Sequence, residues 1–352
     1  MAQRMNLARP GDHDWQLENV FAKTNVAIVL SELGHADEAV QLLSQARTEM
    51  AQIARSHPED SVSEANTIGW SAIAYGTLGR DEEAIRAEND KIAAALRAPN
   101  ADKDQDAQFL VANAHHETAN WLRNLGRNDD AMASARRALG ELLALNARDP
   151  TNVDNIGEIV ATQISLAGLL IDHGDREDAR DLLRQTRARL ATLMARPTPK
   201  RAWRLSDVGR VAELQARLAS TDAERTAADA ALVAYLADVS HYESEGGVVP
   251  QLDVLLVGNA GLSHGDLLAQ AGHLDQAREA WQSTSARIRP VAERLNPAAM
   301  TQLGQLNLRL GGTQDARVWA DRVLGTTYRH PAFADLQQRL GPTQQAGEAA
   351  RL

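Results

Sequence analysis

Six short stretches of the chain share one pattern, and this pattern decides the fold. They read LGHADEAV (33–40), LGRDEEAI (78–85), LGRNDDAM (125–132), HGDREDAR (173–180), AGHLDQAR (271–278) and GGTQDARV (311–318). In each, an alanine lies five residues after a glycine, and a small residue lies seven residues before that glycine. The three positions are Ala27/Gly34/Ala39, Ala72/Gly79/Ala84, Ala119/Gly126/Ala131, Ala167/Gly174/Ala179, Gly265/Gly272/Ala277 and Gly304/Gly311/Ala316. Repetition at fixed offsets indicates an internal structural repeat.

Each position of the pattern has a physical role in a helical hairpin. Glycine adopts the left-handed conformation that ends a first helix at no steric cost. Acidic residues after it favour the positive N-terminal end of a second helix. The alanine lets the two helices approach closely, and a larger side chain there would overpack the contact. The pattern therefore predicts antiparallel helix pairs.

This pattern resembles the tetratricopeptide repeat, in which a small residue, a turn glycine and an alanine occupy these relative positions. The resemblance covers residues 14–340, approximately. Two features depart from the family: the usual tryptophan early in the first helix has no match in register, and an aromatic residue occupies the family's first-helix position only at Tyr75. Successive turn glycines are also 39–48 residues apart, with one longer interval, whereas the usual repeat has about 34 residues.

The interval between Gly174 and Gly272 is about twice the others, so we expect a degenerate fifth pair inside it. Residues 203–218 and 223–239 fit its two helices, joined at 219–222 without a glycine. The resemblance then implies an all-α fold, a right-handed α-solenoid of about seven antiparallel helix pairs. We expect a tail at 1–13, five pairs at 14–240, a loop or hinge at 241–251, two pairs at 252–340 and a tail at 341–352.

Composition narrows the function classes. The formal net charge of −10 argues against general binding to a nucleic-acid backbone. One basic stretch, 184–217, has nine lysines and arginines against two acids, which fits a solvated helix surface or a docking site for an acidic partner. No apolar stretch approaches the ~20 residues that span a bilayer, and the first 15 residues lack the apolar core of a signal peptide.

No motif predicts catalysis or a bound cofactor. The sequence has no cysteine, no phosphate-binding loop and no strained serine nucleophile turn. The run His115–His116–Glu117 lacks the spacing of a zinc-binding helix, so we expect no metal site. Gly258, Gly261 and Gly265 recur on one helix, where close packing explains them. We predict a protein without enzymatic activity, and a site assembled between repeats is the remote alternative.

First helices line the concave face of such a solenoid, which is where partners usually bind. On the third first helix, residues three or four apart form one polar stripe, and a further asparagine lies on the second pair's equivalent face. The predicted partner-binding residues are Asn113, His116, Asn120, Arg123, Asn124 and Asn66. Asparagine both donates and accepts hydrogen bonds, as an extended peptide requires. Gly69 and Gly168 were expected to deepen this groove, and an ordinary hydrated helix face is the alternative.

The sequence thus predicts a scaffold or regulatory module that binds a protein or peptide in its concave groove. A peptide-sensing domain that controls an attached kinase or transcription regulator is the second hypothesis. The repeats and the stretch TTYRHPAFADLQQRL (326–340) resemble repeat regions of bacterial multidomain signalling proteins. We expect no nucleic acid, no membrane insertion and a soluble protein, with the cytoplasm favoured and the periplasm open for a longer, membrane-anchored chain. The sequence predicts no oligomeric state.

Overall fold

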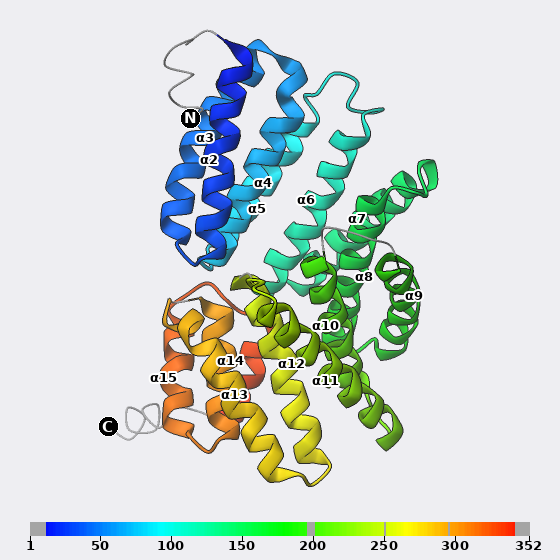
Figure 1. Ribbon diagram of the computed structural model, residues 1–352, viewed down its shortest axis with the longest axis vertical. Coiled ribbons are helices and arrows are strands. Elements are labelled where there is room, and N and C mark those ends of the chain that lie inside the picture. The colour runs from blue at the N-terminus through cyan, green and yellow to red at the C-terminus, as the bar shows by residue number, and fades with distance from the viewer. Residues whose placement is uncertain (1–11, 196–200, 250, 295, 342–352) are drawn as a thin grey trace, which may run out of the picture. The chain divides into compact units, whose positions relative to one another are not determined.

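The structure, a computed structural model, describes residues 12–195, 201–249, 251–294 and 296–341 (Figure 1). In these ranges the chain forms fifteen α-helices, one short 3-10 helix and no strand. The predicted tails fall largely on residues 1–11 and 342–352, which lie outside the described residues. No helix among the described residues is long and apolar enough to cross a membrane.

The helices follow the predicted order of seven pairs, which confirms the all-α repeat fold. The pairs are α2 (His13–Glu32) with α3 (Ala36–Ser56), α4 (Ser61–Thr77) with α5 (Asp81–Ala95), α6 (Gln105–Asn124) with α7 (Asn128–Arg148), α8 (Val153–His173) with α9 (Arg176–Met194), α10 (Arg201–Leu218) with α11 (Asp222–Ser244), α12 (Gln251–Gln270) with α13 (Leu274–Glu293), and α14 (Pro297–Arg309) with α15 (Thr313–Leu324). A further helix, α16 (Pro331–Leu340), follows the last pair and was not predicted as a separate element.

The six turn glycines all have the left-handed backbone that the pattern requires, with φ between 70° and 103°. After each one, the next backbone N–H donates to the carbonyl five residues earlier, at 2.7–2.9 Å. The acceptors are the carbonyls of Leu30, Tyr75, Leu122, Leu170, Leu268 and Asn307. This is the Schellman closure of a helix C-terminus, which satisfies a carbonyl that the helix itself leaves unpaired.

The small residues of the pattern are at the contacts between paired helices. All six alanines that follow the turn glycines are fully buried, as are the four alanines that precede them. Where the preceding residue is glycine, there is no room for more: a Cβ on Gly265 would lie 2.3 Å from the Trp281 indole nitrogen. Cβ atoms on Gly258 and Gly261 would also collide with side chains of α13 and α14, which confirms close packing as the reason for these glycines.

The fifth pair lies in the double-length interval, as predicted. Its turn has no glycine, and a capping box begins α11 instead: the Thr221 hydroxyl accepts from the Glu224 N–H, and the Glu224 carboxylate accepts from the Thr221 N–H. Helix α11 continues to Ser244, so the irregular segment before α12 is shorter than 241–251. Whether that segment is a hinge remains a prediction, as does the domain division drawn around it.

The chain forms two compact units, residues 1–122 with 127–166 and residues 123–126 with 167–352. In the first unit the core is rich in alanine, with the α4–α5 cluster closed by Trp121. In the second unit, Tyr235 and Leu232 centre one cluster, and Phe333 and Leu336 of α16 complete another. Helix α16 therefore covers the apolar end of the last pair, as terminal elements of repeat proteins do.

Replacement of Ala84 by leucine tests the importance of the buried alanines. Ala84 is fully buried between α4 and α5, so added volume must displace neighbouring helices and should lower the unfolding free energy by about 1–3 kcal/mol. Ala93→Leu on the exposed side of α5 is the matched control, because leucine and alanine are both good helix formers. Equal denaturation midpoints for the two variants would contradict close packing at Ala84.

Candidate functional site

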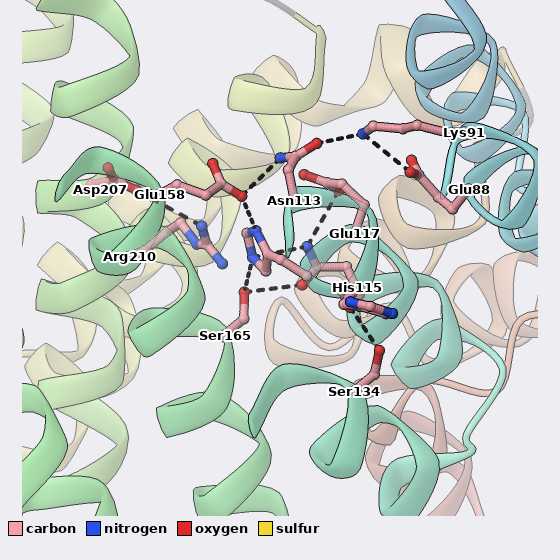
Figure 2. Close-up of polar contacts among 12 residues, drawn as sticks. Glu88, Lys91, Asn113, His115, Glu117, Ser134, Glu158, Ser165, Asp207 and Arg210 are labelled. Carbon is pink, nitrogen blue, oxygen red and sulfur yellow. Dashed lines mark hydrogen bonds and ion pairs between the residues drawn. The ribbon is translucent and has the colours of Figure 1, made fainter. Parts of the chain in front are cut away.

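Helix α6 carries a polar stripe, and Figure 2 shows hydrogen bonds that join it to Glu158 and Ser165 of α8. We call Asn113, His116, Glu117 and Asn120 the α6 stripe. The spacing of three or four residues places them on one helix face. His116 is almost fully buried, whereas Asn113, Glu117 and Asn120 are half-buried. The stripe is thus a surface with a buried polar floor.

Two side chains of α8 organise the stripe. Glu158 Oε1 accepts from Asn113 Nδ2 at 2.8 Å and lies 2.7 Å from His116 Nδ1. Ser165 Oγ lies 3.0 Å from His116 Nε2 and donates to Asn120 Oδ1 at 3.0 Å. The structure therefore brings together three predicted residues, Asn113, His116 and Asn120, through partners from the next pair.

Both ring nitrogens of His116 lie against oxygen atoms of α8. Nδ1 lies 2.7 Å from Glu158 Oε1, and Nε2 lies 3.0 Å from Ser165 Oγ. Burial opposes ionisation of Glu158, but the charge and hydrogen bond of His116 outweigh it and lower the pKa of that carboxyl.

Lys91 of α5 extends the network to the preceding pair. It is 3% exposed, donates to Asn113 Oδ1, and lies 3.2 Å from Glu88 Oε2. Glu88 is fully buried, and burial raises the pKa of its carboxyl to about 7 despite the nearby ammonium. Near neutral pH this carboxyl is therefore poised between its two protonation states.

Gly69 and Gly168 have a different role from the one that the sequence predicts. A Cβ on Gly69 would lie 3.1 Å from Lys91 Nζ, and a Cβ on Gly168 would lie 3.2 Å from the Arg123 guanidinium. The glycines were expected to deepen a groove for a partner. Each instead makes room for a cationic side chain of this chain, which fills the space.

Arg123 belongs to a second network, inside the second unit. Its Nε donates to Asp172 Oδ2 at 2.8 Å, and Arg217 of α10 donates to Asp172 Oδ1 at 2.5 Å. Asp172 is almost fully buried, and the two guanidinium groups overcome its burial and lower the pKa of its carboxyl. Burial, with the charge of Arg123, lowers the pKa of neighbouring His330 to about 3, so that imidazole is neutral. The geometry gives Arg123 a structural role beside its predicted binding role.

The remaining two predicted residues lie outside the α6 stripe. The backbone carbonyl of Asn124 accepts a hydrogen bond from the Arg329 N–H at 2.6 Å, which ties the end of α6 to the segment before α16. Asn66 is exposed on α4. The assignment of all six residues to partner binding remains a prediction.

Sequence reasoning missed Glu158, Ser165, Lys91 and Glu88. One signal could have found the first two. Glu158, Ser165 and Asp172 are seven residues apart on α8, so they share a face, and all three contact α6 side chains. Lys91 had no such signal, because it lies on a second helix and reaches the stripe between α4 and α6.

Two further features bear on ligand binding. His116, Glu117 and Glu158 offer metal-ligand atoms within 4.8 Å of one another, but both nitrogens of His116 are already engaged.

In the second unit, α11, α12 and α13 border a cleft of about 490 Å³. His264 and Arg287 line it and are paired with Asp229 and Glu243. The cleft thus presents few unpaired charges to a ligand.

The raised pKa of Glu88 predicts a pH dependence of stability. Well below pH 4.5 the carboxyl is protonated whether the chain is folded or not; between about 4.5 and 7 it is largely ionised in the unfolded chain but still largely protonated in the folded one. Stability from this group is therefore present at low pH and is lost as the pH rises to about 7. The difference in unfolding free energy between wild type and Glu88→Gln should change by up to about 3 kcal/mol over that range. Denaturant titrations at several pH values measure it. Exposed Glu82→Gln is the control and should show no such trend.

Removal of Arg123 tests its structural role. Arg123→Ala leaves the buried Asp172 with Arg217 alone, and we expect a loss of about 1–3 kcal/mol in unfolding free energy. Arg137→Ala removes an exposed i,i+4 pair with Glu141 and should stay within about 0.5 kcal/mol of wild type. If the two variants unfold at the same denaturant concentration, the Asp172 pair has no structural importance.

Comparisons with known proteins agree with the helical-repeat architecture. No family model and no curated protein sequence matches the chain. Among solved structures, aspartyl phosphate phosphatase F from Bacillus subtilis is similar, with a TM-score of 0.55 and 9% identity over 96% of this chain and 76% of that chain.

A second similar structure is the Rap conjugation gene regulator of plasmid pLS20 in complex with the Phr* peptide. Its TM-score is 0.50, with 14% identity over 85% of this chain and 75% of that chain. At such identities the likeness concerns the fold alone. With six Schellman-closed turns and seven helix pairs, the chain has a tetratricopeptide-like helical-repeat fold.

Proposed function

We propose that this chain is a non-catalytic regulatory module that binds a peptide or an extended segment of a protein along the α6 stripe. The observation that carries the proposal is the arrangement of that stripe: half-buried Asn113, Glu117 and Asn120 above a buried floor of His116 and Glu158. Polar side chains that are held in place by buried partners lose little conformational entropy when they bind a ligand.

The stripe retains hydrogen-bonding capacity for such a ligand. The Asn120 carbonyl oxygen accepts from Ser165, while its amide group has, among the described residues, only contacts of 3.4 Å to His116 and Glu117. Contacts of that length are weak, so a ligand carbonyl can replace them. Asn120 is therefore suited to donate to the backbone of an extended peptide.

The charges near the stripe favour a ligand with a cationic or N–H-rich group. The Glu158 carboxylate is paired with His116, and the buried Glu88 carboxyl is paired with Lys91. Glu117 is half-buried and has a single long hydrogen bond, to Asn120. A lysine, an arginine or an amino terminus of the ligand would complete it.

Two considerations support a non-catalytic role. His116 is paired with Glu158 and Lys91 with Glu88, whereas a nucleophile or general base needs a free position facing the substrate. The similar aspartyl phosphate phosphatase shares only the fold, at 9% identity, and fold alone does not carry an activity.

A peptide-sensing role is the narrower form of the same proposal. It is favoured by the similar Rap regulator, which was solved in complex with a peptide. A sensor must also change conformation when it binds, so small-angle scattering with and without peptide separates the two forms. An unchanged scattering profile on saturation favours a passive scaffold.

Selection from a random peptide library on the immobilised wild-type chain tests the proposed site. Selected peptides should bind Asn120→Ala at least tenfold more weakly in isothermal titration, since the variant removes a donor but leaves the His116–Glu158 pair in place. Glu117→Gln should weaken the binding of cationic peptides in particular.

Gln45→Ala removes an exposed amide from the second helix α3 and serves as the control, with unchanged affinity expected. The double variant His116→Ala/Asn120→Ala should abolish binding, with circular dichroism to verify folding. Peptides that bind all folded variants equally would place the binding site away from the α6 stripe.

A further inference from the structure

Three metal-ligating side chains meet where the first helix pair joins the second. His13 is the first residue of α2, His57 follows the end of α3, and Asp60 ends the short 3-10 helix (Pro58–Asp60) before α4. Each offers a ligand atom, and these atoms lie within 4.8 Å of one another. No sequence pattern predicts this cluster, because His13 is 44 residues from His57.

The polar atoms of this cluster are close together without being hydrogen-bonded. His13 Nε2 is 3.2 Å from Asp60 Oδ2, yet Asp60 Oδ2 is enclosed and has no hydrogen-bond partner among the described residues. His13 Nδ1 is enclosed in the same way, also with no partner in the described ranges. An enclosed carboxylate oxygen without a hydrogen bond is costly, so Asp60 Oδ2 points to a missing ligand.

The spacing fits a metal ion. Two ligands at ~2.1 Å from a tetrahedral zinc ion are about 3.4 Å apart, close to the 3.2 Å between His13 Nε2 and Asp60 Oδ2. The imidazole rings of His13 and His57 have centroids 4.0 Å apart at an angle of 33°. The two histidines are therefore neighbours, and the ligand atoms of both lie within 4.8 Å of each other and of the Asp60 carboxylate.

A supporting carboxylate is also present. His57 Nδ1 lies 3.4 Å from Glu59 Oε1, which leaves Nε2 of the same ring for the ion. Metal-bound histidines commonly donate their second N–H to a carboxylate, which fixes the ring and strengthens the ligand. Glu59 is therefore a positioning residue for His57.

We propose that His13, His57 and Asp60 bind one divalent transition-metal ion, with Zn²⁺ as the best match. Two imidazoles and one carboxylate suit zinc and its borderline neighbours, whereas Mg²⁺ and Ca²⁺ prefer oxygen ligands throughout. Water completes the coordination, since the three side chains are 13–41% exposed and leave the site open to solvent. The ion ties the start of α2 to the α3–α4 connection.

The cluster in the α6 stripe provides an internal comparison. His116, Glu117 and Glu158 meet the same distance condition, but there His116 is hydrogen-bonded to Glu158 and Ser165. An ion at the α6 stripe would have to break these bonds. At His13, His57 and Asp60 it would instead satisfy the enclosed Asp60 Oδ2, so the N-terminal site should bind the ion in preference.

Equilibrium dialysis of chelator-treated protein against Zn²⁺, with Mg²⁺ in excess, tests the proposal. We expect one tightly bound Zn²⁺ per chain, a rise in melting temperature on adding Zn²⁺, and the intense visible absorption of tetrahedral Co²⁺ when Co²⁺ replaces it. His13→Ala, His57→Ala and Asp60→Asn should each weaken Zn²⁺ binding at least tenfold. Asp60→Asn keeps the side-chain size, which guards against loss of folding.

His241→Ala is the control for binding to any surface histidine, because His241 is exposed and adjacent to a carboxylate in the same way. It should bind Zn²⁺ like wild type. The proposal is overturned if Zn²⁺ does not bind stoichiometrically, if His13→Ala/His57→Ala binds it with unchanged affinity, or if His116→Ala alone abolishes binding.

Discussion

A glycine in the left-handed conformation closes the first helix of six pairs, and the rest of the architecture depends on it. The closure fixes where the first helix ends and, through the N–H that follows the glycine, where the second begins. The alanine five residues after each glycine and the small residue seven positions before it are buried, so the helices approach closely. Because these contacts use one face of each first helix, another face is left for polar side chains.

Besides apolar contacts, buried charged groups connect first helices of successive pairs. Glu158 and Ser165 of α8 hold the α6 stripe, and Asp172 binds arginines from the ends of α6 and α10. Buried ion pairs contribute little net stability, since desolvation offsets their attraction. Their directional geometry instead sets the register between pairs, and it keeps the side chains of the α6 stripe in position before any ligand arrives.

The fold was predictable because its determinants are local. The offsets around Gly34 or Gly126 act within one hairpin, and the fifth pair could be inferred from a gap although its turn uses a Thr221–Glu224 capping box. The candidate site was only partly predictable. Asn113, His116 and Asn120 share a helix face, but their partner Glu158 depends on how one pair stacks on the next. The same stacking places Lys91 in the space above Gly69. It also brings His13 close to His57. No short sequence pattern specifies the distances between helix pairs.

Hydrogen exchange measured by mass spectrometry, with and without a saturating selected peptide, is the most direct test of binding at the α6 stripe. Residues 113–124 of α6 and 158–172 of α8 should become the most strongly protected segments, because the ligand contacts α6 and stabilises the α8 side chains beneath it. The second helices α7 and α9 should change little. Protection centred on α7 and α9, or on the cleft between α11 and α13, would contradict the account.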